Sequence, residues 1–213
     1  MSLQDTLSAF LVQAKDAGCQ RLLVAYSGGV DSHVLLFQLN ELNKGDFSIP
    51  LDAIYINHNL QPKALEWGEH CQNICQSLNI PFKQIDVQAK PETGESPEEK
   101  ARTARYQAFS DELQSNHWLV TAQHLDDQAE TFLLQLLRGS GVDGLSAMPS
   151  QRNLGKGCHH RPFLSISRQQ IEQCAKDHDL KWVEDPTNQD RGVPRNYLRQ
   201  NVLPAFKGKW PET

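Results

Sequence analysis

The chain has 213 residues, a mass of 24.1 kDa and a formal net charge of -5 at pH 7. Its hydrophobic content of 38% and charged content of 22% are typical of a globular domain. No apolar run approaches the ~20 residues that a membrane-spanning helix needs, and the N-terminus lacks the pattern of a signal peptide. We therefore expect no membrane partner.

The five cysteines form no close-spaced framework, which predicts reduced thiols and a cytoplasmic location. The charge is divided unevenly, because residues 1–150 hold 10 Lys and Arg against 19 Asp and Glu, whereas residues 151–213 hold 11 against 7. A basic C-terminal third is suited to meeting a polyanion locally.

Apolar spacing along the first half alternates between helical and extended patterns. Strands that recur at intervals of roughly 30 residues with helices between them indicate βαβ units and a parallel sheet. The expected elements are a helix at 3–17, a buried strand at 22–26, a helix after residue 29, a strand at 53–57, a helix at 66–78 and a strand at 82–87.

The second half continues this alternation and then becomes basic. Ser96 is the expected N-cap of a helix that has Pro97 at its first position, and Gly139 ends a later helix. The other expected features are a strand at 118–122, a Gly-rich irregular segment at 139–160, a late unit with a helix at 168–179, and a final basic helix at 195–206.

The predicted fold class is therefore α/β, a doubly wound parallel sheet with helices on both faces and a short helical C-terminal extension. We expect an α/β core at residues 1–150 and a basic extension at 151–213. The end of the chain soon after its last helix suggests a fragment or a missing partner domain.

The segment at 27–32 lies between a buried strand and the start of a helix, which is where α/β sheets bind anions. Two glycines let the backbone approach a phosphate closely, and serine hydroxyls add donors. A plain tight turn is the alternative. The segment has neither the Gly-Lys-Ser/Thr of a P-loop nor the G-x-G-x-x-G dinucleotide fingerprint. It consists of Ser27, Gly28, Gly29, Val30, Asp31 and Ser32.

This hexapeptide resembles the SGGxDS loop of the N-type ATP pyrophosphatases, which have an adenine nucleotide alpha hydrolase-like, Rossmann-like fold. Later stretches resemble the tRNA(Ile)-lysidine synthetase family from about residue 20 to about residue 204. They are the segments at 57–60, 101–106, 121–131, 137–141, 161–164, 182–188 and 195–199.

The resemblance implies a ligase that uses ATP and Mg²⁺. ATP adenylates the C2 oxygen of the wobble cytidine in an isoleucine tRNA with a CAU anticodon. The amine of free L-lysine then attacks C2, and the products are lysidine, AMP and pyrophosphate. Adenylation is needed because AMP is a good leaving group. The amine must lose a proton, since its usual pKa is about 10.4. A homodimer is also compatible with the resemblance.

By this resemblance, Asp31, Arg105, His124 and Asp127 are the expected catalytic residues. The loop at 27–32 and His58 bind the nucleotide, and Asp31 and Asp127 hold Mg²⁺. The expected substrate-binding residues are Arg102, Arg105, Arg161 and Arg195.

The residue types support these roles, although each has a simpler explanation. Arg102 and Arg105 share one helical face, and guanidinium groups suit phosphate, but both are also ordinary surface residues. An aspartate at a helix start, such as Asp127, is explained equally well by capping. Arg161, Arg195 and Arg199 of the basic third are candidates to contact the tRNA or the target base, and a solvated basic face is the alternative for Arg199. The segment at 139–157 is expected to be a loop that closes on the substrate, with a plain connection as its alternative.

Two departures from the family pattern matter. Gln123 stands where the family has the first of two histidines, and the C-terminal tRNA-binding region of the family is absent after Thr213.

Two other functions stay open. A tRNA 2-thiolation enzyme uses the same adenylation but needs reactive cysteines, usually in C-x-x-C pairs. A non-catalytic ATP-binding module would give no pyrophosphate exchange.

Overall fold

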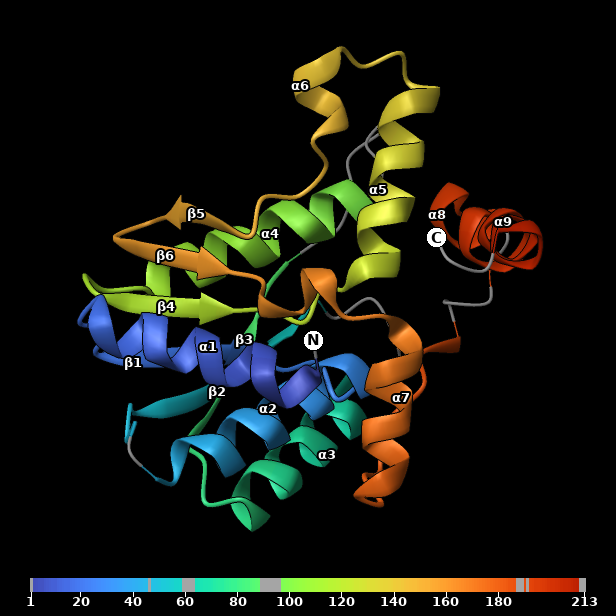
Figure 1. Cartoon of the computed structure of the whole chain (residues 1–213). Coiled ribbons are helices and arrows are strands. Elements are labelled where there is room, and N and C mark those ends of the chain that lie inside the picture. Colours follow the sequence, from blue (N-terminus) through green and yellow to red (C-terminus); the bar gives the residue numbers. More distant parts are fainter. Residues whose placement is uncertain are drawn as a thin grey trace.

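A six-stranded sheet runs through the part of the molecule that the computed structural model describes, which comprises residues 2–45, 47–58, 64–88, 97–186, 190 and 192–210. Its strand order is β3-β2-β1-β4-β6-β5 (Figure 1). The strands are β1 (Arg21–Ala25), β2 (Leu51–Asn57), β3 (Phe82–Asp86), β4 (His117–Val120), β5 (Gln151–Leu154) and β6 (Gly157–His160).

Neighbouring strands are parallel from β3 to β6, and β5 alone pairs in the antiparallel direction, as the edge strand of a hairpin with β6. The chain first builds β1, β2 and β3 outward in one direction and then returns to place β4 on the other side of β1. This reversal at β1 is the topological switch point, where open α/β sheets bind their ligands beside the carboxyl ends of the strands.

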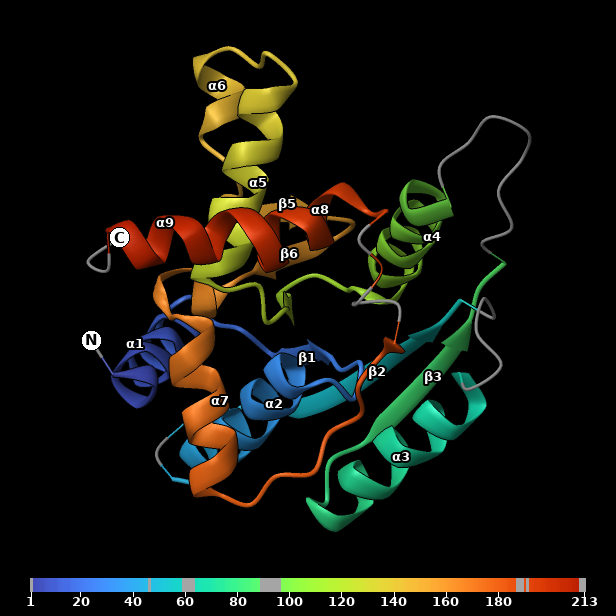
Figure 2. The ribbon, with the colours of Figure 1, turned by 90° about the vertical axis from the view of Figure 1, so that its right-hand side faces the viewer.

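Helices cover both faces of the sheet, which confirms the predicted doubly wound architecture (Figure 2). One face packs against helices α1, α2 and α3, with α7 packed on α2, and the other face packs against α4. Apolar side chains of β1 enter both cores, which explains its continuous hydrophobic sequence. The helices are α1 (Leu3–Asp16), α2 (Val30–Asn43), α3 (Ala64–Ser77), α4 (Pro97–Glu112), α5 (Leu125–Leu137), α6 (Val142–Leu145), α7 (Arg168–Asp177), α8 (Pro194–Tyr197) and α9 (Leu203–Lys209).

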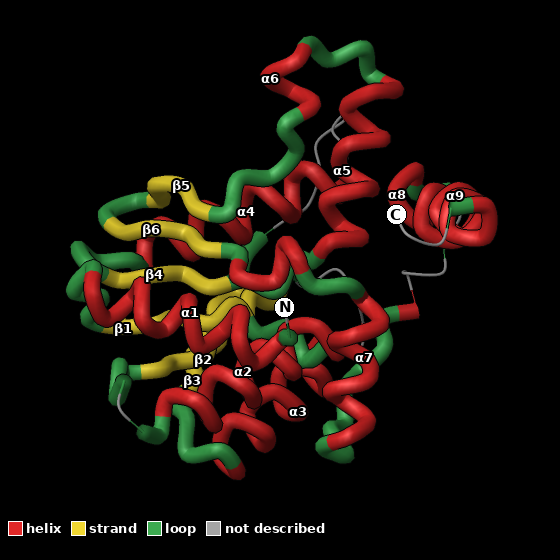
Figure 3. Tube along the Cα trace, in the orientation of Figure 1, coloured by secondary structure: helices red, strands yellow, loops and turns green. Residues whose placement is uncertain are grey.

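The expectation of an irregular segment at 139–160 was wrong, because it contains helix α6 and the β5–β6 hairpin (Figure 3). Its glycines have specific structural roles. Gly155 turns the hairpin at a φ of +55°, and a Cβ on Gly157 would lie 2.3 Å from the carbonyl oxygen of His117. Glycine is therefore needed for the turn and for close strand packing, and the same residues look like a loop in sequence.

The C-terminal extension is helical, as predicted, but it is not one regular helix. Helix α8 continues into a π-helical turn at Leu198–Val202 and then into α9. The extension lies across α5 (Figure 2). Strands β5 and β6 of the basic segment complete the sheet of the first 150 residues, so the two segments share one sheet. The predicted N-cap Ser96 lies outside the described residues.

None of the helices in the described ranges has both the length and the hydropathy needed to cross a membrane.

Candidate nucleotide and substrate site

The loop at 27–32 joins the carboxyl end of β1 to the N-terminus of α2. The hydroxyl of Ser32 organises it, since this oxygen accepts a hydrogen bond from the Ser27 backbone N–H at 3.1 Å and donates to the Gly29 carbonyl at 3.0 Å. Gly29 is the N-cap of α2 and supplies no side-chain cap. The first amides of a 14-residue helix are thus left for an anionic ligand.

Gly28 can only be glycine in this loop. Its φ is +80°, and a Cβ there would lie 2.9 Å from Cγ2 of Val183 and 3.1 Å from Sγ of Cys71. Its carbonyl oxygen also accepts a hydrogen bond from the Val183 backbone N–H at 3.0 Å. The segment after α7 therefore packs directly on the loop, and a side chain at residue 28 would push it away.

Four acidic side chains gather beside this loop, at the start of α5 and the start of α2. His124 lies between them with 2% of its side chain exposed. Its Nε2 is 3.7 Å from Oδ1 of Asp31 and 3.5 Å from Oδ2 of Asp127, and its Nδ1 is 3.9 Å from Oδ2 of Asp126. The fourth carboxylate, Glu130, is one turn further along α5. The structure thus brings together three of the four predicted catalytic residues.

Asp31 is held in an unusual electrostatic state. Burial raises the pKa of its carboxyl group, although the charge of Arg168 opposes the shift. Oδ2 accepts a 2.8 Å hydrogen bond from Nη1 of Arg168, whereas buried Oδ1 has no hydrogen-bond partner in the described part of the chain. An oxygen with a free lone pair beside a second carboxylate suits a cation. Mg²⁺ commonly takes one or two protein carboxylates and completes its shell with phosphate oxygens and water. Asp31 and Asp127 fit that donor set.

Asp126 has a different role from its neighbour Asp127. Its Oδ2 accepts a 2.9 Å hydrogen bond from the backbone N–H of Arg168 at the start of α7, and Lys207 of α9 donates to its Oδ1. Burial alone would raise the pKa of Asp126, but these bonds outweigh that effect and lower it. Asp127 caps α5 by accepting from the His124 backbone N–H at 3.1 Å, so the capping explanation holds for Asp127 alongside its position at the site.

Glu130 is a functional candidate that our sequence analysis missed. Its side chain is 0% exposed and accepts hydrogen bonds from Nε of Arg195 at 2.7 Å and from Nε of Arg199 at 2.6 Å. Arg199 also reaches Oδ1 of Asp127 at 3.2 Å. Burial would lower the pKa of Arg199, but the hydrogen bond and charge of Glu130 raise it. The predicted substrate-binding residue Arg195 is therefore hydrogen-bonded to the protein, and the alternative of a solvated basic face does not describe Arg199.

A second, cationic cluster surrounds the ring of Tyr106 on α4. The guanidinium carbons of Arg102, Arg105 and Arg152 lie 5.1, 5.9 and 4.7 Å from its ring centroid. Arg161, only 3% exposed, donates to the Pro149 carbonyl at 2.7 Å, and burial lowers the pKa of its guanidinium. Like charges at this density indicate a surface that an anion would stabilise.

His58 follows β2 and interacts electrostatically with Arg105 of the cationic cluster. Burial and then the charge of Arg105 lower its pKa to about 4, so this imidazole is neutral at pH 7. Arg105, the remaining predicted catalytic residue, thus lies near His58 and beside the ring of Tyr106.

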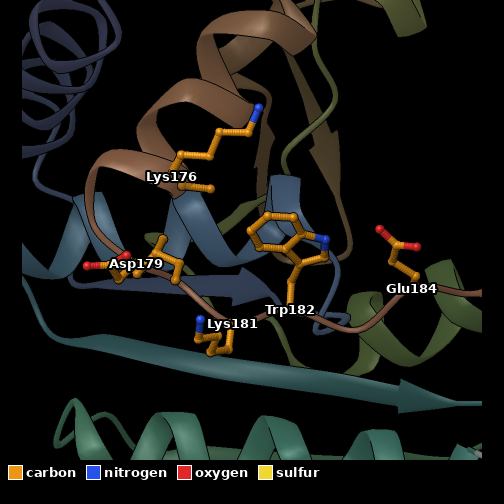
Figure 4. Close-up of a pocket in the computed structure, with 7 residues that line it drawn as sticks. Lys176, Asp179, Lys181, Trp182 and Glu184 are labelled. Atoms are coloured by element: carbon orange, nitrogen blue, oxygen red, sulfur yellow. The ribbon is translucent and has the colours of Figure 1, made fainter.

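A surface cavity of about 470 Å³ lies at the end of α7 (Figure 4). None of the predicted site residues lines it. The labelled side chains come from the end of α7 and the segment that follows it. It is lined by Ala175, Lys176, Asp179, Leu180, Lys181, Trp182 and Glu184. No residue of the loop or of either cluster lines the cavity, although its lining residues Trp182 and Glu184 flank Val183, which packs on Gly28 of the loop.

The residues that the sequence analysis missed as site members are Glu130, Arg168 and Tyr106. Glu130 and Tyr106 lie inside segments that resemble the family. Their closeness in sequence to the predicted residues Asp127 and Arg105 was the signal that could have identified them. Arg168 had none, because its contact with Asp31 spans 137 residues.

Comparison with known proteins identifies the family of the chain. A model of the PP-loop domain matches residues 2–206. The tRNA(Ile)-lysidine synthase of Pseudomonas fluorescens is 49% identical over 195 residues, which cover 92% of this chain and 44% of that protein. The synthase of Coxiella burnetii is 50% identical over 189 residues, covering 89% and 42%. The chain thus spans less than half the length of these curated relatives.

Solved structures show the same fold at low sequence identity. A U34-tRNA thiolase from Methanococcus maripaludis has a TM-score of 0.74 at 17% identity, covering 90% of this chain and 66% of that chain. An NH3-dependent NAD synthetase from Campylobacter jejuni has a TM-score of 0.55 at 17% identity, covering 99% and 96%.

Proposed function

The chain belongs to the PP-loop domain family, and from this we propose that it ligates lysine to C2 of the wobble cytidine in an isoleucine tRNA with a CAU anticodon. ATP is the second substrate, and the products are lysidine, AMP and pyrophosphate. The proposal follows the curated relatives at 49% and 50% identity, which are named tRNA(Ile)-lysidine synthase. We also propose a cytoplasmic location, since all five cysteines are free thiols.

One structural observation carries the proposal. An uncapped helix N-terminus at Gly29 lies beside the half-buried carboxylate of Asp31, whose buried Oδ1 has no hydrogen-bond partner among the described residues. The amides suit the phosphates of ATP, and the carboxylate suits a cation that accompanies them. Mg²⁺ held by Asp31 and Asp127 would neutralise phosphate charge when bound.

The acidic group also suits the second half-reaction. A lysine side chain enters as an ammonium ion, which carboxylates attract, and it must lose a proton before it can attack C2. We propose that His124 accepts this proton, because its Nε2 faces both Asp31 and Asp127 and its buried Nδ1 has no hydrogen-bond partner among the described residues. Asp127 stabilises the resulting imidazolium.

The cluster around Tyr106 suits the RNA. Arg102 is exposed and Arg105 is half-buried on the same face of α4, where guanidinium groups can pair with backbone phosphates. We propose these two residues as RNA contacts. For Arg161 and Arg195, whose guanidinium groups bond to the protein, the RNA contact stays a prediction.

The thiolation alternative needs a cysteine that forms a thiolate readily. Burial raises the pKa of Cys71, and it raises that of Cys75 to about 12. Both thiols stay protonated at neutral pH, so neither Cys71 nor Cys75 is suited to sulfur transfer.

The experiment combines the chain with ATP, Mg²⁺, radiolabelled lysine and a CAU-anticodon isoleucine tRNA transcript. A matched transcript carries uridine at the wobble position. We expect label in the first RNA alone. Pyrophosphate release without label in either RNA would contradict lysine ligation, and ATP binding with neither signal would favour a non-catalytic module.

A further inference from the structure

A chain of hydrogen bonds crosses the end of the sheet from β5 and β6 to β4. It begins at His159, a fully buried residue of β6. Its Nδ1 is 3.3 Å from Nε of Arg152 and 3.2 Å from Nη2 of Arg161. An arginine side chain can only donate hydrogen bonds, so Nδ1 must be the acceptor in both contacts.

These two contacts fix the tautomer of His159. Burial, and then the charges of Arg161 and Arg152, lower its pKa to about 2, so the ring is neutral and carries one proton. Because Nδ1 accepts, the proton is on Nε2. The Nε2–H therefore donates to Oγ1 of Thr121 at 2.7 Å.

The hydroxyl of Thr121 links His159 to Gln123 by two hydrogen bonds. Its oxygen accepts from His159, and its proton is donated to Oε1 of Gln123. The opposite amide orientation would place an NH₂ group against the same oxygen and leave the buried hydroxyl proton without an acceptor. Arg152 and Arg161 thus determine, through two intermediates, which way the Gln123 amide faces.

The free end of Gln123 is its NH₂ group, which makes no hydrogen bond to the described residues. Gln123 lies just before His124, at the carboxyl end of β4, and β4 is the neighbour of the strand that carries the loop at 27–32. Among the described residues Thr121 is the hydrogen-bond partner of Gln123, so a donor of fixed orientation points away from Thr121 at the edge of the sheet that carries the loop at 27–32.

We propose that Gln123 donates a hydrogen bond to an acceptor atom of a substrate, and that Thr121 and His159 are positioning residues that hold its amide in the donating orientation. The inference rests on the proposed function for the identity of the substrates. The acceptor is an oxygen of the ATP phosphates or an acceptor on the edge of the target cytosine, and binding measurements distinguish these two sources. Gln123 cannot act as a base, since an amide does not take up a proton at neutral pH.

The first test replaces Gln123 by an isosteric acceptor. Gln123→Glu keeps the Thr121 contact and exchanges the NH₂ for a carboxylate oxygen. The exposed Gln72→Glu on α3 is the control with the same charge change. Dissociation constants are measured for ATP with Mg²⁺ and for an anticodon stem-loop of the isoleucine tRNA. We expect a loss of about tenfold or more for Gln123→Glu in one arm, and none for the control. Weaker binding of ATP identifies a phosphate oxygen as the acceptor of the Gln123 hydrogen bond. Weaker binding of the stem-loop identifies the target base as the acceptor.

The second test examines the positioning role. Thr121→Ser keeps the hydroxyl, and Thr121→Val removes it at nearly constant shape. For the ligand that Gln123→Glu binds more weakly, we expect Thr121→Val to raise the dissociation constant by about threefold to tenfold. We expect Thr121→Ser to bind that ligand as tightly as the wild type. Thermal unfolding of each variant reports on structural damage.

Unchanged binding of both ligands to Gln123→Glu would overturn the proposal, and equal losses for Thr121→Ser and Thr121→Val would overturn the positioning role. Absence of lysine incorporation by the wild-type chain would instead contradict the proposed function. These binding measurements do not depend on that outcome.

Discussion

Glu130 accepts a 2.7 Å hydrogen bond from Nε of Arg195, 65 residues later in the chain. Arg195 also donates to the Asp127 carbonyl and to the Thr131 hydroxyl, at 3.3 and 3.0 Å. These hydrogen bonds hold the C-terminal helical segment at 192–210 against α5, the helix that carries Asp127. The extension therefore supports the site as well as contributing basic residues near it.

Replacing Glu130 by Gln should be strongly destabilising. The substitution removes a fully buried carboxylate that pairs with two arginines. Breaking a buried ion pair lowers the free energy of unfolding by about 3–5 kcal/mol, because the remaining charges lose their partner. Urea unfolding measures this loss. Glu172→Gln, which breaks a partly exposed pair with Arg168, is the control and should cost at most about 1 kcal/mol. Equal effects of the two substitutions would show that Glu130 does not anchor the extension.

Replacing Asp31 by Asn should abolish ATP-dependent pyrophosphate release without lowering stability. Burial already disfavours the charged carboxylate, and Arg168 keeps a second partner in Glu172. The neutral amide therefore fits the fold but lacks the negative charge that a cation needs. Pyrophosphate release and thermal unfolding are measured together, with the exposed Asp143→Asn as the control. Retained activity in Asp31→Asn would remove this residue from the mechanism.

Replacing Arg102 by Ala should weaken RNA binding and its dependence on salt. If Arg102 pairs with one phosphate, its loss reduces the slope of log affinity against log salt concentration by about 1. Filter binding of the isoleucine tRNA between low and moderate salt measures the slope. Arg21→Ala is the control, because Arg21 lies at the start of β1, at the opposite end of the strands, and pairs with Asp52. An unchanged slope would exclude a phosphate contact.

The free energy of unfolding should fall as the pH decreases from 6.5 towards 4. Burial lowers the pKa of His160 from 6.5 to about 4, so the unfolded chain binds a proton that the folded chain excludes. Stability is therefore lost as the pH falls through the unfolded value. His160→Phe keeps a ring against Trp118, whose centroid is 3.8 Å away, and removes this proton. Between pH 7 and 5 the wild type should lose about 2 kcal/mol more than the variant in urea unfolding. Parallel pH profiles would contradict the assignment.

Periodicity and local motifs were enough to predict most of the fold. The run at 22–26 is apolar at every position, which requires burial on both faces, and the following loop could only face the switch point of a parallel sheet. The β5–β6 hairpin was missed because Gly155 and Gly157 meet tertiary requirements, a turn and a close approach to His117, that sequence alone cannot distinguish from a loop.

The sequence by itself determined the parallel α/β class, the position of the glycine loop at 27–32 at its switch point, and the placement of His124, Asp126 and Asp127 after β4, because each follows from local spacing. Only the tertiary structure decided the state of the individual side chains. The pairing of Asp31 with Arg168, of Glu130 with Arg195, and the fixed amide of Gln123 all depend on contacts between residues or strands distant in the chain. The protonation of a side chain and the direction of its hydrogen bonds depend on its burial and on the positions of its partners. The spacing of residues along one segment gives neither its burial nor its partners.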